Sequence, residues 1–270
     1  MKLSCSSPMV PGDTLTEKAR FLRSCGYDAI AVFMERSEFT DEVFAELLEL
    51  KEKTGVFPCE FVFSDPYYGR LMDGDPQARD KALRLYSDAA AVCARLGAVT
   101  ELEFQYGAQN PLPLFTPYRK MNARQEADFL ETYGAVAAVA AGSGAAVLIE
   151  PINRYESPYL NCVRDCVELL GKLNRPNTGL LLDFFHMCIE ERDLVGSIRA
   201  AGSLIRHVHI ADSNRLLPGY GSIDWGACLS ALRETGYDGF LNLECAVCGD
   251  PYKTLPETAV FLKGLSGIRR

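Results

Sequence analysis

The sequence has few histidines and no long hydrophobic run, and each absence limits what the protein can be. Only three of its 270 residues are histidine, so a site built from many imidazoles is excluded. No stretch approaches the ~18 uninterrupted apolar residues of a transmembrane helix. Residues 1–12 contain one lysine and no apolar run of signal-peptide length. We therefore expect a soluble, cytoplasmic protein.

Positive charge is also scarce relative to negative charge. Lys and Arg number 28 against 36 Asp and Glu, which gives a formal net charge of −8 at pH 7 and a pI of about 5.1. Such a chain offers no broad electropositive surface for nucleic acid or anionic lipid. We expect neither a nucleic-acid partner nor a membrane partner. A small substrate that is neutral or weakly charged fits this charge better.

The ten cysteines lack the spacing of a disulfide framework. They are scattered, mostly inside apolar runs, whereas small secreted domains space their cysteines for bridges. Cys245 and Cys248 form a Cys-x-x-Cys pair without a second pair at zinc-site spacing. We expect reduced thiols packed in a core rather than a structural zinc.

What the sequence does contain is the pattern of an α/β protein. Short β-branched or aliphatic runs alternate with longer helical patterns, and no Pro/Ser-rich linker divides them. Strands are predicted at 2–5, 28–33, 56–63, 98–104, 145–150, 178–183, 207–211 and 240–244. Helices are predicted between them, for example at 41–53, 77–96, 123–141 and 225–235, and Gly26, Gly55, Gly97 and Gly236 are placed to end several of the helices.

Eight strand–helix units in ~250 residues are the size of a (β/α)8 barrel. A doubly wound open sheet is the competing topology, but no Gly-x-Gly-x-x-Gly follows the first predicted strand. We therefore predict the α/β class and a (β/α)8 TIM barrel that forms a single domain over residues 1–270.

The last four predicted strands carry metal-binding side chains near their carboxyl ends. In chain order these are Glu150, Asp183, His209 and Glu244, separated by 33, 26 and 35 residues. Each separation is about one βα unit, and the active site of a TIM barrel lies at this end of the strands. Three converging carboxylates repel one another unless a cation lies among them. We therefore predict that the four residues bind one divalent metal ion.

Strand alternation supports this prediction. Leu148 with Glu150, Leu181 with Asp183, and Asn242 with Glu244 should face inward. Any one of these carboxylates could instead cap the following helix, but four ligand-type residues in register favour a metal site. Oxygen-rich ligands with one imidazole suit Mn²⁺, Mg²⁺ or Co²⁺ better than a zinc ion that prefers thiolates.

Other polar residues near these strand ends admit two interpretations. His207 lies one layer deeper than His209 on the same strand face, so we expect a satisfied core histidine. His186 is expected in the loop above the barrel, where an imidazole can donate to a substrate oxygen. Glu156 and Arg215 are expected in the loops after the fifth and seventh strands. From the residues alone, each is either a substrate contact or a solvated loop charge.

Four segments together resemble the xylose isomerase-like sugar epimerase/isomerase barrels. They are residues 149–156 (IEPINRYE), 182–191 (LDFFHMCIEE), 207–215 (HVHIADSNR) and 218–221 (PGYG). The nearest subgroup is the D-tagatose/D-psicose (ketose) 3-epimerases. The specific match covers about residues 145–245, while the first half agrees only in the order of strands and helices.

The resemblance implies a ketose 3-epimerase that acts through a cis-enediolate. It implies that the four strand-end residues are the metal ligands and that Glu150 and Glu244 are also the acid/base pair. It further implies that Glu156, His186 and Arg215 contact the carbonyl end of the substrate. The expected cofactor is one divalent ion, Mn²⁺ first, with Mg²⁺ or Co²⁺ as alternatives. We also expect a homo-oligomer, either a dimer or a tetramer.

The sequence departs from the subgroup at two places. Residues 104–110 (FQYGAQN), after the fourth strand, lack the tryptophan expected to help shape the sugar pocket. Cys245 and Ala246 follow Glu244 where Pro-Phe is expected. Both differences bear on the identity of the substrate more than on the chemistry.

Several functions share this ligand set. A metal that stabilises an enediolate allows a proton to leave the carbon next to a ketone. Return to the other face gives epimerisation, and return to the neighbouring carbon gives isomerisation. The alternatives are therefore an isomerase of a keto acid such as hydroxypyruvate, of a keto-inositol or of another sugar, and a lyase or decarboxylase acting on a 3-oxo sugar.

Two functions from other classes fit the sequence less well. An endonuclease IV-like phosphodiesterase needs many histidines and a basic groove, which three histidines and a net charge of −8 do not provide. A non-catalytic sugar-binding barrel does not need three carboxylates at its rim. The sequence therefore favours an enzyme.

Overall fold

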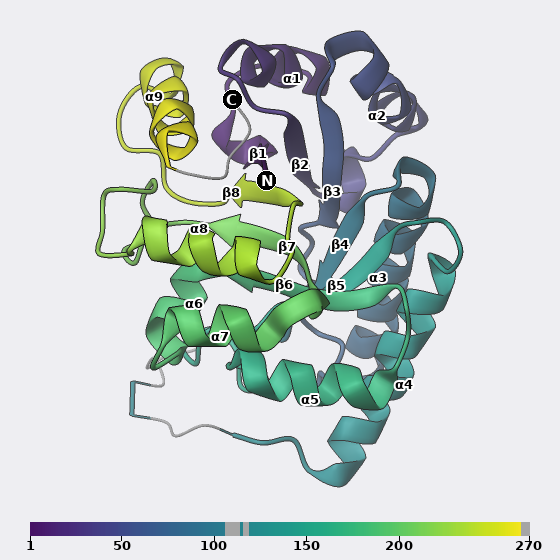
Figure 1. Cartoon of the computed structure of the whole chain (residues 1–270). Helices are drawn as coiled ribbons and strands as arrows, with labels where there is room; N and C mark the ends of the chain where they lie inside the picture. Colours follow the sequence, from purple (N-terminus) through teal and green to yellow (C-terminus); the bar gives the residue numbers. More distant parts are fainter. Residues whose placement is uncertain (106–113, 116–118, 266–270) are drawn as a thin grey trace.

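The eight strands form a closed parallel barrel in a computed structural model, which describes residues 1–105, 114–115 and 119–265. The strands follow one another in chain order, and β8 pairs with β1 to close the barrel. The strands are β1 Lys2–Ser6, β2 Ala29–Met34, β3 Phe57–Phe63, β4 Val99–Leu102, β5 Ala146–Ile149, β6 Thr178–Asp183, β7 Ile205–Ile210 and β8 Phe240–Leu243. The predicted (β/α)8 TIM barrel is confirmed (Figure 1).

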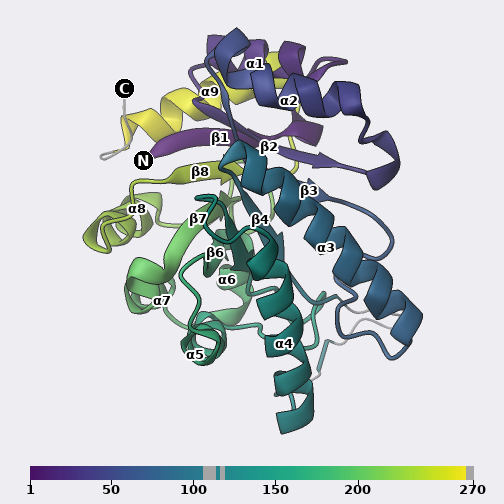
Figure 2. The ribbon, with the colours of Figure 1, turned by 90° about the vertical axis from the view of Figure 1, so that its right-hand side faces the viewer.

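Helices surround the barrel, as two perpendicular views show (Figures 1 and 2). They are α1 Leu15–Ser24, α2 Asp41–Thr54, α3 Pro76–Leu96, α4 Ala123–Val139, α5 Val163–Leu173, α6 Phe184–Glu190, α7 Leu194–Ala201, α8 Trp225–Glu234 and α9 Pro251–Gly264. Short 3-10 helices lie at Ser7–Met9, Arg36–Glu38 and Gly202–Leu204. Two helices, α6 and α7, separate β6 from β7, and α6 begins directly at the end of β6.

Local sequence explains where the helices begin and end. The side chain of Thr40 accepts a hydrogen bond from the first turn of α2, and Asp75 caps α3 in the same way. Gly55 and Gly97 end these helices with φ of 74° and 69°. This left-handed conformation is costly for residues with a Cβ atom. The prediction that these two glycines end helices is confirmed.

The main hydrophobic core lies between the strands and the helices, and a smaller hydrophobic cluster lies on the inner face of the strands. The small cluster contains Ala146, Leu148 and Leu181. Their strand neighbours, such as Val147 and Leu180, belong to the main core. Because side chains alternate along a strand, the residues two positions after Leu148 and Leu181 face the same interior. The alternation therefore brings Glu150 and Asp183 to the mouth of the barrel.

The ten cysteines are free thiols, and five of them are buried. Cys245 is half-buried and packs against the core, while Cys248 is exposed, so the expectation that the cysteines pack in a core is wrong for Cys248. The short segment that carries them leaves the barrel after β8 and leads to α9, where a side chain can reach solvent.

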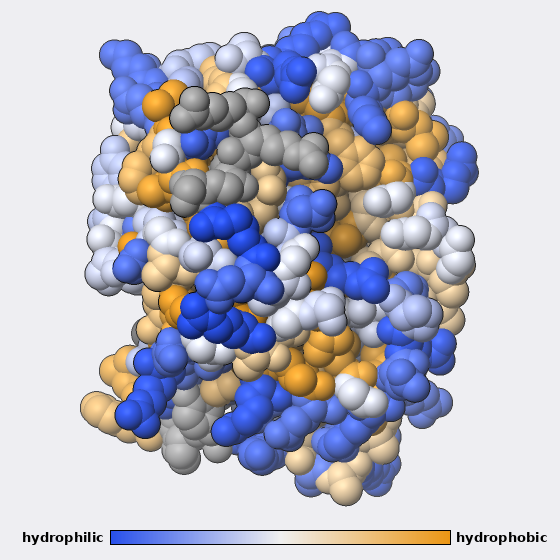
Figure 3. Space-filling model, viewed as in Figure 1, coloured by the Kyte–Doolittle hydropathy of each residue, from blue (hydrophilic) through white to orange (hydrophobic). Residues whose placement is uncertain are grey.

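No helix in the described ranges is both long and apolar enough to cross a membrane. The face in Figure 3 mixes hydrophilic and hydrophobic side chains. The large hydrophobic side chains that are exposed include Tyr252, Val260 and Phe261 of α9.

Candidate functional site

Glu150, Asp183, His209 and Glu244 come together at the carboxyl ends of the last four strands. Each offers one ligand-type atom, and the four atoms lie within 4.8 Å of one another. Asp183 and His209 pair directly between β6 and β7, while Glu150 and Glu244 follow β5 and β8. The first three residues are buried. The side chain of Glu244 is 26% exposed, so the cluster opens toward solvent on that side.

The donor set of this cluster fits a divalent metal ion. Three carboxylates and one imidazole suit a hard or borderline cation. Glu150 Oε1 is buried without a hydrogen-bond partner among the described residues. A buried carboxylate oxygen without a partner is costly unless a cation or a proton satisfies it. The four residues would therefore hold such an ion, although their role as ligands stays a prediction.

Burial and crowding favour protonation of several carboxyl groups here. Burial raises the pKa of Glu150 well above its ordinary value, and nearby Glu101 raises it further. Burial raises the pKa of Glu101 as well. For Glu103 on the same side of the barrel, burial together with Glu244 raises the pKa to about 8. The mouth of the barrel therefore holds more carboxylates than it can keep negatively charged without added positive charge.

Arg215 supplies part of that positive charge. Its Nη1 contacts Asp183 Oδ2, and its Nη2 lies 2.7 Å from Glu244 Oε2. Although burial opposes ionisation of Asp183, the Arg215 guanidinium keeps the pKa of Asp183 below its ordinary value. The φ of Arg215 is +62°, a conformation that is uncommon outside glycine and is concentrated at functional sites. The structure thus places Arg215 in the predicted loop and turns it toward the cluster.

Asp212 fixes the loop that carries Arg215, a role that the sequence analysis did not identify. Its carboxylate accepts hydrogen bonds from three backbone N–H groups of the loop at 2.8–3.2 Å and from Trp225 Nε1 at 2.9 Å. A Cβ atom at Gly221 would lie 2.2 Å from Asp212 Oδ1, so the loop needs glycine there. The available signal was an aspartate at the end of a strand followed by the glycine-rich segment 218–221.

His186 lies on α6, which corrects the prediction that it lies in a loop. The helix begins at once because the Asp183 side chain accepts a hydrogen bond from its first turn. His186 is buried, and its Nδ1 accepts from Asn153 N at 3.3 Å and lies 2.7 Å from Asn153 Nδ2. These two donors assign the ring proton to Nε2. That Nε2 lies 3.9 Å from both Glu150 Oε1 and Asp183 Oδ2.

Asn153 also holds Glu156, although the sequence analysis gave it no role. Its Nδ2 donates to Glu156 Oε1 at 2.7 Å. Glu156 lies exposed in the predicted loop after β5, and the pair Arg154–Glu190 ties that loop to α6 at 2.8 Å. Asn153 therefore connects two of the predicted substrate contacts, Glu156 and His186. Its position in the segment 149–156 was the signal that could have identified it.

Glu60 of β3 contacts the histidines of β7. Its Oε2 lies 2.8 Å from His209 Nε2 and 3.4 Å from His207 Nε2. All three side chains are buried, and their ligand-type atoms form a second group within 4.8 Å. His207 is buried as predicted, but its Nε2 makes no hydrogen bond to a described residue. The sequence analysis missed Glu60 because it lies within a strand that otherwise reads as apolar.

A cavity of about 370 Å³ opens beside the cluster. Its lining is Ser6, Pro8, Met9, Phe33, Ser64, Arg215, Glu244 and Cys245. Two of the predicted site residues, Arg215 and Glu244, thus face a space for a small molecule. Cys245, one of the two departures from the epimerase pattern, lines that space. Residues 106–110, which include most of the other departure, lie outside the described residues.

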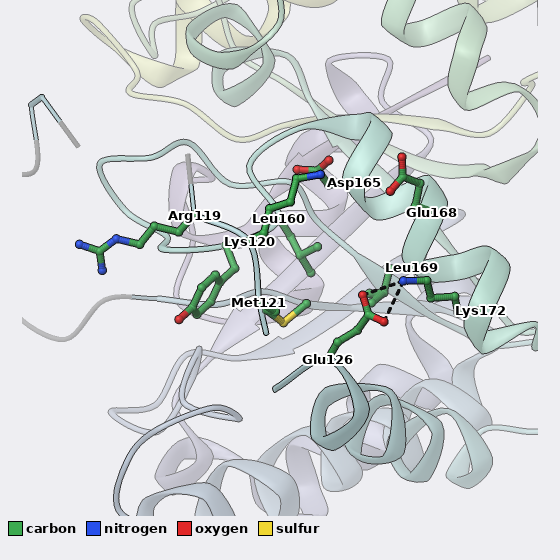
Figure 4. Close-up of a pocket in the computed structure, with 10 residues that line it drawn as sticks. Arg119, Lys120, Met121, Glu126, Leu160, Asp165, Glu168, Leu169 and Lys172 are labelled. Carbon is green, nitrogen blue, oxygen red and sulfur yellow. Dashed lines mark hydrogen bonds and ion pairs between the residues drawn. The ribbon is translucent and has the colours of Figure 1, made fainter. Parts of the chain in front are cut away.

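A second pocket, of about 220 Å³, lies next to α4 and α5 (Figure 4). An ion pair between Glu126 and Lys172 crosses one side of it at 2.7 Å. Arg119 extends away from the other side chains drawn there. None of the predicted site residues lines this pocket, so the chemistry is expected at the barrel mouth.

The chain belongs to the xylose isomerase-like TIM barrel family, whose sequence model matches residues 19–265. A ketose 3-epimerase of Arthrobacter globiformis is 31% identical over 243 residues, which cover 88% of this chain and 81% of that relative. A 3-dehydro-D-guloside 4-epimerase of Escherichia coli (strain K12) is 32% identical over 126 residues, covering 46% and 48%. The resemblance noted in the sequence is therefore confirmed.

The solved structures agree on the fold. The crystal structure of a 3-keto-D-glucoside 4-epimerase from E. coli has a TM-score of 0.84 and 23% identity, and covers 98% of this chain and 99% of that chain. The whole described barrel therefore has the arrangement of a known sugar-epimerase barrel.

The raised pKa of Glu103 predicts a pH dependence of stability. The pKa of Glu103 is about 8 in the folded protein and 4.5 for an ordinary glutamate. Protonation of Glu103 therefore contributes free energy of folding that is fully present below pH 4.5 and is lost as the pH rises through about 8. Glu103→Gln removes this titration and should flatten the fall in unfolding free energy of the metal-free protein between about pH 6 and about pH 9. Urea denaturation measures it, with exposed Glu234→Gln as the control. Equal slopes in wild type and Glu103→Gln would contradict the assignment.

Proposed function

We propose that this protein is a metal-dependent epimerase that inverts C3 of a ketose through a cis-enediolate. The observation that carries the proposal is the convergence of Glu150, Asp183, His209 and Glu244 at the mouth of a barrel of this family. A relative that is 31% identical over most of its length is a ketose 3-epimerase. The cavity beside the four residues offers space for a small sugar.

The four residues would hold one divalent ion, and we propose Mn²⁺ before Mg²⁺ or Co²⁺. When bound, the ion supplies a Lewis acid for the carbonyl and adjacent hydroxyl oxygens of the substrate. His186 would donate its Nε2 proton to a substrate oxygen, because Asn153 occupies its Nδ1. Arg215 and Glu156 would bind the same end of the sugar from the two loops that carry them.

Glu150 and Glu244 would move the proton. They follow β5 and β8, which are three strands apart around the barrel, so their carboxyl groups approach the cluster from different directions. One removes the hydrogen from one face of the sugar, and the other returns a proton to the opposite face. Positioned carboxyl groups of this kind contribute roughly 10²–10⁴-fold to a proton-transfer step.

A second candidate is epimerisation at C4 of a 3-oxo glycoside. The relative from E. coli that is 32% identical over about half of this chain is a 3-dehydro-D-guloside 4-epimerase. The hydrogen at C4 of a 3-oxo sugar also lies next to a ketone, so the same carboxylate pair would serve. The keto-acid, keto-inositol, lyase and decarboxylase alternatives need the same site and are separated by substrate screening.

We further propose a cytoplasmic homo-oligomer, a dimer or a tetramer, built from one domain over residues 1–270. The exposed Tyr252, Val260 and Phe261 of α9 support an interface between copies, since large exposed apolar side chains often mark contact surfaces. The net charge of −8 supports a protein without nucleic-acid or membrane partners. The proposed partner is a small sugar.

Removal of one ligand should release the metal. Asp183→Ala and His209→Ala each remove a donor from a four-donor set, so both variants should lose bound ion on mild chelation that leaves the wild type loaded. Elemental analysis after dialysis measures the metal content. Lys172→Ala, in the separate pocket of Figure 4, is the control and should stay loaded. Unchanged metal content in both ligand variants would contradict the site.

Replacement of either glutamate by glutamine should stop epimer interconversion. Glu150→Gln and Glu244→Gln keep the size and one donor oxygen but remove the proton-accepting carboxylate, so interconversion should fall by about 10²–10⁴-fold. Each metal-loaded variant should still exchange the α-hydrogen of one epimer with deuterated solvent.

Both interconversion and deuterium exchange are measured by NMR with Mn²⁺ added. The substrates to screen are free and phosphorylated ketoses and 3-oxo glycosides. Near wild-type interconversion in both variants would make these residues ligands only, with His186 as the next proton carrier.

A further inference from the structure

The proposed proton transfer gives Glu60 no role, yet its side chain is fully buried inside the barrel. β3 stands four strands away from β7 in the ring of eight, so the side chain crosses the interior to reach His209. A buried carboxylate costs several kcal/mol unless it is paired and hydrogen-bonded. Placing a glutamate between Cys59 and Phe61 is therefore costly, and the contact across the barrel must compensate for it.

The two ring nitrogens of His209 face different partners. Nε2 lies 2.8 Å from Glu60 Oε2, and Nδ1 lies 3.1 Å from Glu244 Oε2. Glu244 belongs to the proposed ligand set, so Nδ1 is the nitrogen turned toward that cluster. A histidine binds a metal only through a nitrogen that carries no proton. The ring can therefore serve as a ligand only if its proton stays on Nε2.

We propose that Glu60 is a positioning residue that holds the proton of His209 on Nε2 and so presents Nδ1 to the divalent ion. This inference rests on the proposed function. An acidic acceptor behind a ligating imidazole fixes the tautomer and the ring orientation and makes the ligating nitrogen more basic. His207 Nε2 lies 3.4 Å from the same Glu60 oxygen but makes no hydrogen bond to a described residue, so the short contact of this oxygen is the one with His209.

Ligation of a second ion is the alternative role for these three residues, because Glu60, His207 and His209 offer ligand-type atoms within 4.8 Å of one another. The geometry favours the hydrogen bond. A separation of 2.8 Å between Nε2 and Oε2 is the length of a direct hydrogen bond, and a ring nitrogen that donates its proton in this bond cannot also bind an ion. The number of ions bound per chain distinguishes the hydrogen bond, which predicts one ion, from a second metal site, which predicts two.

The test is Mn²⁺ binding to the metal-free protein, measured by calorimetry for wild type and Glu60→Gln. Glutamine keeps the size of the side chain and removes its charge. We expect one ion per chain in both proteins and a dissociation constant about 10–100-fold higher in the variant. Glu60→Asp keeps the charge on a shorter side chain and should bind more tightly than Glu60→Gln. If Glu60→Gln does not fold, the dissociation constant of Glu60→Asp is compared with that of the wild type instead.

The matched control is Glu46→Gln, the same exchange at a half-buried glutamate of α2 that accepts hydrogen bonds from Thr16 N and Oγ1, away from the mouth of the barrel. Its effect on the dissociation constant should be much smaller. A ¹⁵N NMR spectrum of the Mg²⁺-loaded wild type should show the His209 proton on Nε2, and Glu60→Gln should weaken that signature. A residue that only supported the fold would leave this tautomer unchanged.

Two results would overturn the inference. One is an unchanged dissociation constant and tautomer in folded Glu60→Gln. The other is two ions per wild-type chain that fall to one in the variant, which would make Glu60 a ligand. Absence of any bound ion in the wild type would instead contradict the proposed function, so the two failures are distinguishable.

Discussion

Repulsion among buried carboxylates is the constraint on which the rest of this site depends. Glu101, Glu103, Glu150, Asp183 and Glu244 converge on the mouth of one barrel, and burial raises the pKa of the first three. Carboxylates in such a place must gain protons or gather positive charge. The fold does the second by turning Arg215 onto Asp183 and Glu244. A divalent ion would reduce the same repulsion with a greater positive charge. The carboxylate cluster that is unfavourable for folding is therefore favourable for binding a metal ion.

The scaffold turns this constraint into a fixed geometry. Parallel strands deliver the four ligand-type side chains from rigid positions, while the loops that carry Arg215 and Glu156 are themselves held. Asp212 fixes the first loop through three backbone donors and Trp225, and Asn153 links the second loop to His186. Sites that are held this firmly lose little free energy to reorganisation during the reaction. The proposed substrate contacts are therefore positioned by residues that need not touch the sugar.

The sequence predicted the barrel and the four clustered residues because both depend on local pattern. Strand alternation and a spacing of one βα unit place Glu150, Asp183, His209 and Glu244 together without knowledge of the packing. It missed what depends on contacts across the barrel, above all Glu60, whose partner lies 149 residues away. It placed His186 in a loop because the sequence alone does not show that Asp183, at the end of β6, also caps a helix that begins at the next residue. The role of Asp212 likewise depends on donors that only the folded loop gathers.

In the proposed function, a divalent ion replaces protons as the charge that holds these carboxylates together. Calorimetric titration of the metal-free protein with Mn²⁺ at about pH 6.5, in buffers with different ionisation enthalpies, counts the protons released on binding. Because burial raises the pKa of Glu150, ion binding should displace protons, and we expect release of protons and tighter binding as the pH rises. Binding without proton release and with the same affinity from about pH 6 to about pH 8 would contradict it.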